Sequence, residues 1–449
     1  MLSGRGKEAL GHWEKALSTY ETLGDANKAA TIHLQLAQQY QPQAVGTRDP
    51  ERGYTHAGKA VTLLEPKGDS VELALAYTRV GFIAAHRNEP LSAGLTPLEK
   101  GLALAQRLGD TARVGEAAAS LGHVLLYHVG AINRGLELTH EGYEAAKRSG
   151  DKVLLADAVL RVSESYLTLR DTDGALHWAE EAAKVCTQSG VLLSQIQSSL
   201  LLGWVSVLQG DTARAVLGLE TAQQTAKKAG VEITQISRPN LFALAMVPFF
   251  LGDWEKTESG LLKCIESRAL VFPIQTACLS GWLCLERGDL VRAKEHVREA
   301  VTLCETRGEK TLEVTPLTLS AEIASKGGEL DEAAAHLSQA RKIMSKPQEW
   351  RGLAAEVHLS DGILATCEKR WQEALDAFQT AVEVNRQYRL PYYEARSLFE
   401  WGQMHISRNS TGDRERGLQL LGESLDIFQR IQAKKMVEKV LARKQVLES

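Results

Sequence analysis

The stretch LLLGWVSVLQGDTARAVLGLETA, residues 200–222, contains the pattern that decides the fold of this chain. It places three small residues, Gly203, Ala215 and Ala222, among large apolar side chains. Residues 278–300, CLSGWLCLERGDLVRAKEHVREA, repeat this layout with small residues at the same internal spacings of 12 and 7. The small residues therefore belong to a structural repeat, in which we expect them to mark points of close packing between helices.

A small residue on an apolar segment, followed about seven positions later by a turn, recurs along almost the whole sequence. These anchor positions are Ala37, Gly81, Gly122, Ser163, Gly203, Ala245, Gly281, Ala321, Gly362 and Gly402. Their spacings lie between 36 and 44 residues, which gives a period of about 40. Such a period is typical of stacked supersecondary units that bury their hydrophobic faces only against their neighbours.

Each unit divides into two helices at a turn in which a glycine precedes an acidic residue. The turn glycines are Gly210, Gly252, Gly288 and Gly328. Glycine just past a helix end adopts the left-handed conformation without a steric penalty. The acidic residue that follows it is expected to cap the next helix.

The second helices carry pairs of small residues seven positions apart, which is two helical turns and therefore one helix face. The pairs are Ala175/Ala182, Ala215/Ala222, Thr257/Cys264, Ala293/Ala300, Ala333/Ala340, Ala374/Ala381 and Gly417/Ser424. Two antiparallel helices approach closely only where the crossing point carries little side chain. Leucine at Gly203 or Gly281 is therefore expected to overpack the crossing and to destabilise the fold by roughly 1–3 kcal/mol.

This repeat resembles the tetratricopeptide repeat (TPR). The matching positions are Leu202-Gly203 and Val80-Gly81 in the first helix, Tyr40 and Tyr166 at its aromatic place, and ALDAFQTA at 374–381 in the second helix. The likeness covers roughly residues 7–432, although the period is about 40 rather than the ~34 of most TPRs, as in longer-helix TPRs of bacterial regulatory proteins. The resemblance implies an all-α, right-handed superhelical solenoid of antiparallel helix pairs.

The chain is expected to have three parts. Residues 1–25 form a partial repeat with a second helix only, residues 26–432 form about ten TPR-like repeats, and residues 433–449 form a C-terminal capping helix. In the first part, Leu10, Trp13 and Leu17 would face nothing, whereas a solenoid end normally needs a polar cap. This favours either a longer polypeptide that continues upstream or a first helix that docks on a partner.

The C-terminal helix is expected to terminate the array. It combines an outer Lys/Arg face with an apolar stripe of Met436, Val437, Val440 and Leu441. Residues 412–449 also resemble the closing segment of TPR regions in bacterial signalling proteins. Those proteins have an upstream ATPase module, often with an adenylate/guanylate cyclase or a MalT-like DNA-binding domain. The resemblance implies a sensor or partner-binding arm, with an upstream ATPase or cyclase domain as a further partner.

The bulk composition indicates an ordered helical chain and excludes several classes of function. Of its 449 residues, 44% are hydrophobic and 24% charged, and proline occurs only 11 times. A net charge of -4 provides no basic surface of the kind that nucleic acid requires, so no nucleic-acid partner is expected. No apolar run reaches the ~18 residues of a membrane helix, and the first residues lack an apolar signal core. We therefore predict a cytoplasmic chain with no membrane partner.

The sequence contains no constellation of residues that points to catalysis, a cofactor or a metal. GRGKE at residues 4–8 lacks the earlier glycine and the following Ser or Thr of a phosphate-binding loop. His123 and His128 lie five positions apart and would face different sides of a helix. The six cysteines include no CxxC pair and fit reduced core thiols. The expectation is a protein that is not an enzyme and holds neither cofactor nor metal.

The concave face of the predicted solenoid is the expected binding surface, and the residue after each anchor position should point to it. We call these residues the inner-wall positions. The large apolar ones, with two neighbouring phenylalanines, form the candidate partner-binding groove: Phe82, Trp204, Phe242, Met246, Phe250 and Trp282. Such a groove would bind a peptide or protein partner. Two alternatives remain: longer helices bury these side chains between layers, or the chain is a structural scaffold that forms oligomers through its ends.

Overall fold

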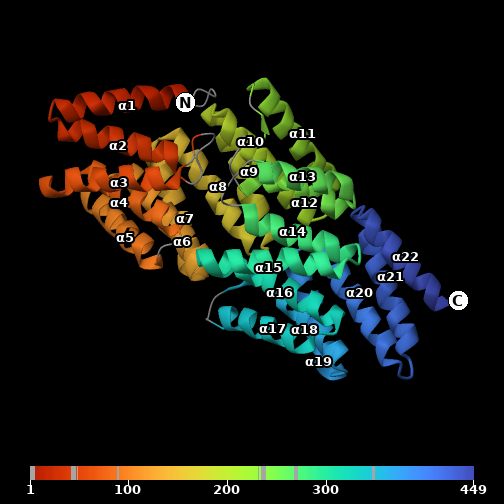
Figure 1. Ribbon diagram of the computed structural model, residues 1–449. Helices are drawn as coiled ribbons and strands as arrows, with labels where there is room; N and C mark the ends of the chain where they lie inside the picture. The colour runs from red at the N-terminus through yellow and green to blue at the C-terminus, as the bar shows by residue number, and fades with distance from the viewer. Residues whose placement is uncertain are drawn as a thin grey trace.

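The computed structural model describes residues 6–41, 47, 49–87, 90–230, 232–233, 239–266, 272–345 and 349–448. Within this part of the chain there are 22 α-helices and no β-strand. The helices alternate in direction and stack side by side from one end of the molecule to the other (Figure 1). The prediction of an all-α solenoid of antiparallel helix pairs is confirmed.

The helices are mostly between 13 and 18 residues long. They are α1 (Gly6–Thr22), α2 (Ala26–Tyr40), α3 (Pro50–Leu64), α4 (Val71–Ala85), α5 (Leu91–Leu108), α6 (Thr111–Val124), α7 (Ile132–Ser149), α8 (Lys152–Thr168), α9 (Thr172–Ser189), α10 (Leu192–Leu208), α11 (Thr212–Lys228), α12 (Ala243–Leu251), α13 (Trp254–Glu266), α14 (Phe272–Glu286), α15 (Leu290–Arg307), α16 (Lys310–Gly327), α17 (Leu330–Met344), α18 (Ala354–Cys367), α19 (Trp371–Gln387), α20 (Pro391–Arg408), α21 (Asp413–Arg430) and α22 (Lys434–Glu448). Short helical turns η1 (Glu65–Lys67), η2 (Leu125–Val129), η4 (Pro239–Phe242) and η5 (Arg351–Leu353) join some of them.

From α2 to α21 the helices form ten consecutive hairpins, each made of an even-numbered and the next odd-numbered helix. The anchor positions lie where the two helices of a hairpin cross, and all ten are buried. A Cβ atom added at Gly122 would come within 2.7 Å of the Gly135 carbonyl oxygen. The hydroxyl of Ser163 uses the same close approach to donate a 2.8 Å hydrogen bond to the Ala175 carbonyl. Small residues at these positions therefore permit close packing, as the repeat predicts.

Of the four glycine–acid turns named above, three follow the predicted chemistry, with caps from Asp211, Asp253 and Asp289. Gly210 has φ of +80°, and the Asp211 carboxylate caps α11 by accepting a 3.0 Å hydrogen bond from the Arg214 amide. Glu329 precedes α17 in the corresponding place but makes no side-chain capping bond. Its longer side chain instead contacts the Lys294 ammonium group on the neighbouring hairpin. The capping prediction is therefore wrong at Glu329.

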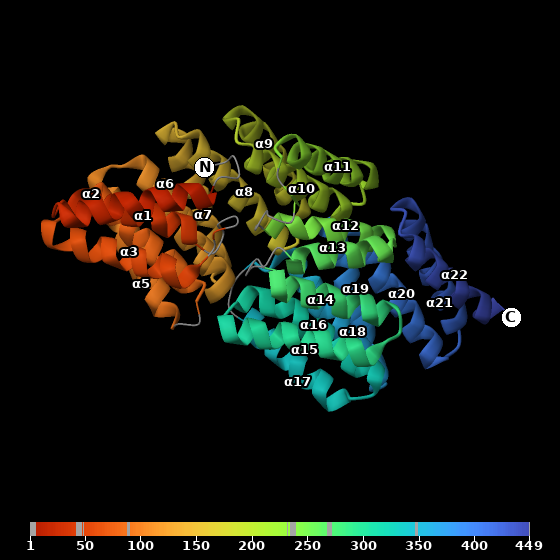
Figure 2. The same ribbon diagram turned by 45° about the horizontal axis from the view of Figure 1, so that its top comes forward.

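The solenoid turns back on itself, so that hairpins far apart in the sequence touch (Figure 2). The Leu353 amide donates a 3.1 Å hydrogen bond to the Leu169 carbonyl, and the Thr172 hydroxyl donates one of 2.6 Å to the Tyr388 carbonyl. The Thr311 hydroxyl likewise donates to the Leu126 carbonyl. These contacts join η2, the α8–α9 turn and the start of α9 with α16, η5 and the α19–α20 turn. Other helices consequently cover the middle of the inner wall, and one apolar core extends from Tyr143 to Val440.

The two ends of the array differ from the expectations in detail. Leu17 of α1 is buried against α2, and Leu10 and Trp13 are half-buried on the same cluster, so these side chains are partly covered. In α22, Met436 and Val440 are buried, whereas Leu441 is 47% exposed and does not belong to the buried stripe. None of the described helices combines the length and the apolar character needed to cross a bilayer.

Candidate binding site in the superhelical interior

The inner-wall positions differ in burial from the ends of the array to its middle. Gln38 is exposed, and His123, Glu164 and Gln403 are half-buried. The remaining six positions are buried: Phe82, Trp204, Met246, Trp282, Glu322 and Ile363. The first helices therefore do present these residues inward, but in the middle of the array they face other helices across the interior.

The six candidate groove residues are all buried, with between 2% and 9% of each residue exposed. Four of them, Trp204, Phe242, Met246 and Trp282, line one cavity, which opens partly to solvent. Phe250 lies beside this group, with its ring 4.6 Å from that of Tyr392 on α20. Phe82 lies elsewhere, against His86 and His123 in the N-terminal hairpins. The structure thus brings five of the six residues into one region and separates Phe82 from them.

The cavity has a volume of about 80 Å³ and two walls of different origin. One wall comes from α10, η4, α12 and α14, which carry the four aromatic and thioether side chains and also Gln275 and Cys278. The opposite wall comes from α16, η5 and α20, through residues that include Thr315, Leu353 and Tyr393. A cavity of this size holds several water-sized groups or one small organic side chain.

Two polar atoms in the first wall have no hydrogen-bond partner in the described part of the chain. They are the indole nitrogen of Trp204, which donates only, and the amide oxygen of Gln275, which accepts only. Trp204 is 5% exposed, so its N–H group is withdrawn from bulk water. Leaving a buried polar group unsatisfied costs about 1–3 kcal/mol, and such groups in a native fold call for an explanation. A bound group that accepts from the Trp204 N–H group and donates to the Gln275 oxygen would explain both atoms.

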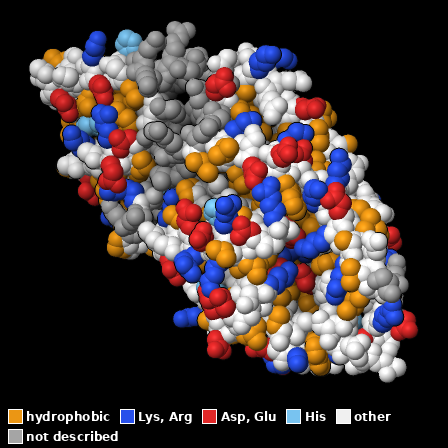
Figure 3. Space-filling view, turned by 45° about the vertical axis from the view of Figure 1, so that its right-hand side comes forward, with side chains coloured by type: hydrophobic (Ala, Val, Ile, Leu, Met, Phe, Trp, Pro, Cys, Tyr) orange, Lys and Arg blue, Asp and Glu red, His pale blue; other side chains and the backbone are white. Residues whose placement is uncertain are grey.

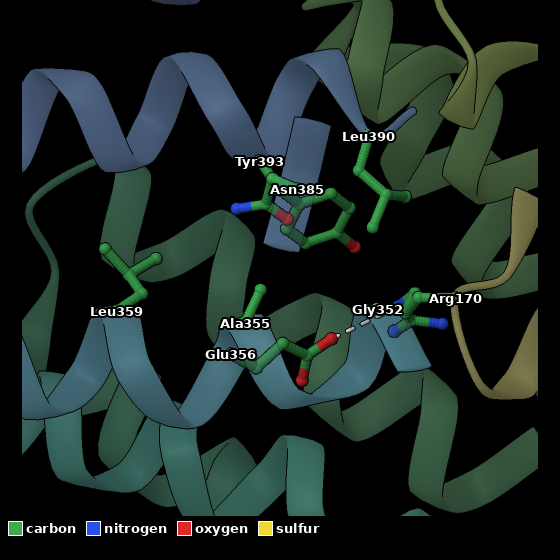
Figure 4. A pocket seen from close by; sticks show the side chains of 8 residues that line it. All are labelled: Arg170, Gly352, Ala355, Glu356, Leu359, Asn385, Leu390 and Tyr393. Atoms are coloured by element: carbon green, nitrogen blue, oxygen red, sulfur yellow. Dashed lines mark hydrogen bonds and ion pairs between the residues drawn. The ribbon is translucent and has the colours of Figure 1, made fainter. Parts of the chain in front are cut away.

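The charged residue of the cavity wall is already paired. The Arg170 guanidinium binds the Glu356 carboxylate with an Nε–Oε1 distance of 3.2 Å. Figure 4 shows the Tyr393 ring descending from α20 toward this pair. Burial of Tyr393 raises the pKa of its hydroxyl to about 12, so the phenol is neutral at pH 7. Burial likewise raises the pKa of the Cys278 thiol. The cavity therefore offers no uncompensated charge to a ligand.

A cluster of six charged side chains borders the cavity beyond Trp282. It contains three acids and three bases, from α14, α16, α20 and α22: Glu286, Glu322, Lys326, Arg396, Glu400 and Lys439. The Lys439 ammonium lies 2.7 Å from the Glu286 carboxylate. This lysine of α22 therefore points toward the buried acid and does not belong to the outer face of the helix. The Arg396 guanidinium binds the Glu322 carboxylate and lies 5.2 Å from the Trp282 ring centre.

These pairs keep the buried acids ionised. Burial alone would raise the pKa of Glu322, but Arg396 and Lys326 outweigh it and lower that pKa to about 2. Burial opposes ionisation of Glu286 in the same way, and Lys439 and Arg396 again lower its pKa. The cluster is balanced, with three acids and three bases, so it adds no net charge to the interior.

Phe82 packs against a second polar cluster, which consists of His86, His123 and His128. The His86 ring stacks on that of His123 at 5.5 Å and meets that of His128 edge-on at 5.3 Å. Burial, reinforced by His128, lowers the pKa of His86 to about 3, and burial lowers that of His128 to about 4. The three rings are therefore neutral at pH 7. Among the described residues, no group of three or more His, Cys, Asp or Glu side chains is arranged to hold a metal ion.

Sequence reasoning found one wall of the cavity and missed the other. Thr315, Leu353 and Tyr393 lie 111 to 189 residues after Trp204 and reach it only because the solenoid closes on itself. Gln275 lies on the wall that sequence reasoning found, six residues before Gly281. A polar residue within an apolar stretch was the signal that could have identified it.

Fold and site together define a closed helical-repeat solenoid with an internal cavity. No protein-family model and no curated protein matches the chain. Among solved structures, the arrangement is similar to a Rap protein in complex with competence and sporulation factor, at 11% identity and a TM-score of 0.43 over 95% of this chain and 98% of that one. The Cut9–Hcn1 hetero-tetramer gives 11% and 0.40 over 98% of both chains. The apo form of RapI gives 10% and 0.36 over 96% and 99%. These likenesses do not extend beyond the general arrangement of stacked helices.

Proposed function

We propose that the chain is a non-catalytic interaction or sensing module that binds a peptide or protein partner. The partner inserts one anchoring side chain into the interior cavity lined by Trp204, Phe242, Met246 and Trp282. The observation that supports this is the combination of an aromatic-lined cavity and three polar atoms of its lining residues that lack hydrogen-bond partners in the described part of the chain, on Trp204, Gln275 and Tyr393. Buried aromatic pockets that accept one anchor residue carry most of the binding energy in many interfaces.

The surface of the molecule does not favour a strongly charged partner. Figure 3 shows Lys and Arg side chains mixed with Asp and Glu side chains over one face, with apolar groups between them. The net charge of -4 agrees with this mixture. The likeness of residues 412–449 to the end of bacterial TPR regions supports a role as the C-terminal regulatory arm of a bacterial multidomain signalling protein.

The proposal is tested by selecting peptides from a displayed library on the whole chain and measuring their dissociation constants. Trp204→Ala removes an anchor contact from the cavity wall and is expected to weaken selected peptides at least about tenfold, as for a hot-spot residue. Trp371→Ala on α19 is the control, because Trp371 is half-buried outside the cavity. Circular dichroism establishes that both variants keep their helix content. Equal affinities for the two variants would overturn the proposal.

One observation favours a second function, a scaffold that assembles through its N-terminal end. On α1, Leu10 and Trp13 are only half-buried, and Leu23 beyond it is 71% exposed. If this end mediates assembly, the double variant Leu10→Ser/Trp13→Ser is expected to lower the oligomeric state measured by analytical ultracentrifugation. A wild-type chain that sediments as a monomer at all concentrations would exclude this function.

A further inference from the structure

The chemistry of the cavity wall identifies the kind of side chain that it accepts. Resting on the function proposed above, we infer that the anchoring residue of the partner is a tyrosine, whose phenol hydroxyl accepts from the Trp204 indole N–H and donates to the Gln275 amide oxygen.

The hydrogen-bonding inventory of the wall carries this inference. An indole N–H group can only donate, and an amide oxygen can only accept. Both atoms are without a partner in the described part of the chain, and both residues line the same cavity. A hydroxyl group is the smallest side-chain group that both accepts and donates, so a phenol matches the hydrogen-bonding chemistry of both atoms. A phenylalanine or leucine side chain would leave each of them unpaired, at the desolvation penalty of a buried polar group.

The walls also favour an aromatic ring over an aliphatic chain. The rings of Trp204 and Phe242 meet edge to face, with their centres 5.4 Å apart. Aromatic rings gain from such arrangements beyond the burial of area, and the Met246 thioether adds a polarisable contact.

The same walls exclude a charged anchor. Arg170 already pairs with Glu356, and the bordering cluster contains three acids and three bases. A carboxylate or ammonium group placed in the cavity would have no free counter-charge, and transfer of an unpaired charge into an apolar site is strongly unfavourable. A neutral phenol avoids this penalty.

The inference is tested with small probes that isolate the hydroxyl group. p-Cresol carries the tyrosine side chain, toluene carries the phenylalanine side chain, and 4-hydroxybenzoate adds a carboxylate to the phenol. Their dissociation constants for the whole chain are measured by NMR titration or isothermal calorimetry. We expect p-cresol to bind at least about fivefold more tightly than toluene, since one hydrogen bond is worth roughly that factor, and 4-hydroxybenzoate to bind most weakly.

A matched pair of variants assigns the difference to one indole group. Trp204→Phe removes the N–H group without breaking any hydrogen bond, and it should reduce the preference for p-cresol over toluene several-fold, because only the Gln275 oxygen then pairs with the phenol, while leaving toluene binding within about twofold. Trp401→Phe removes another buried indole N–H group that lacks a partner, but Trp401 does not line the cavity, so the preference should persist. Equal affinities for p-cresol and toluene in the wild-type chain, or a preference unaltered by Trp204→Phe, would refute the inference.

The outcome separates this inference from the function on which it rests. If selected peptides depend on Trp204 but not on a tyrosine, as shown by replacing each peptide tyrosine with phenylalanine, the function stands and the tyrosine assignment is wrong. If p-cresol binds as expected but no peptide depends on Trp204, the cavity binds free phenols and the proposed function fails.

Discussion

The interior of the solenoid contains two clusters of titratable side chains, and they differ in how these side chains are accommodated away from water. Around α4 and α6, His86, His123 and His128 lie inside as neutral rings whose pKa values are lowered by burial. Around α16 and α20, Glu322 and Arg396 lie inside as a charged pair. His123 and Glu322 occupy the same inner-wall position of their repeats, directly after Gly122 and Ala321. The repeat therefore fixes the place of the residue, and its surroundings decide whether it is ionised.

The two halves of the molecule are therefore sensitive to different changes. A buried neutral histidine needs no counter-charge. However, the folded state loses stability at a pH at which the same histidine is protonated in the unfolded chain. A buried ion pair stays charged in acid as long as the pKa of its carboxylate is low. Removal of either partner, however, leaves the other as a buried charge that is not compensated. Changes of pH should act first on the N-terminal hairpins, and removal of one charge should act most strongly on the C-terminal ones.

The largest effect is expected from Arg396→Ala. This change leaves the Glu322 carboxylate, whose side chain is 2% exposed, without its principal partner. Breaking a buried pair in this way destabilises a protein by about 3–5 kcal/mol. Urea unfolding followed by circular dichroism measures the loss. Arg370→Ala is the control, because Arg370 contacts Glu368 and Glu373 at the surface and should contribute less than about 1 kcal/mol. Similar losses for the two variants would contradict the role assigned to the cluster.

A smaller effect for each residue involved, in the N-terminal hairpins, is expected on acidification. The unfolded chain takes up protons on its histidines as the pH falls through about 6.5, whereas the folded chain keeps His86 and His128 neutral down to about pH 3 and 4. Unfolding therefore takes up protons, and the free energy of unfolding should fall by up to ~1.4 kcal/mol per pH unit for each such histidine below pH 6.5. Glu322, with a pKa of about 2, stays charged over this range.

Local measurements test this difference directly. Hydrogen exchange read by mass spectrometry should show that α6 loses protection between pH 6.5 and 4.5 before α16 does. Replacing a buried histidine, as in His123→Gln, should flatten the pH dependence of stability. His12→Gln, at an exposed position of α1, should leave it unaltered. Simultaneous loss of protection in α6 and α16 would show that the two clusters do not respond separately.

The sequence predicted the local rules of this fold well, because each rule concerns residues on one hairpin. The anchor positions, the paired small residues and caps such as Asp211 all depend on neighbours within a few helical turns. The closure of the solenoid was not predictable, because the bond between Leu353 and Leu169 joins positions 184 residues apart and leaves no periodic signal. For the same reason half of the cavity wall and the pairing of Glu322 with Arg396 could not be predicted.

The smallest effect on stability is expected when a glycine in either half of the chain, Gly122 or Gly402, is replaced by alanine. A methyl group at Gly122 would lie 2.7 Å from the Gly135 carbonyl oxygen and 2.8 Å from the Thr139 amide nitrogen, both backbone atoms of α7. At Gly402 the nearest backbone atom, the Gly417 oxygen, lies at 3.1 Å, and the next neighbour is the Leu421 side chain, which can move. Alanine gains about 0.5–1 kcal/mol over glycine inside a helix, and overpacking costs about 1–3 kcal/mol.

Gly122→Ala should therefore lower the free energy of unfolding by about 1–2 kcal/mol, whereas Gly402→Ala should leave it almost unchanged because its gain and cost nearly cancel. Gly58→Ala in α3 is the reference for the gain alone, since nothing lies within 4 Å of the added carbon, and it should stabilise the chain slightly. Urea unfolding of the three variants at pH 7.5 keeps the histidines out of the comparison. If Gly122→Ala were as well tolerated as Gly58→Ala, the hairpin of α6 and α7 would have room to separate, and close packing at the anchor positions would not be what holds the repeats together.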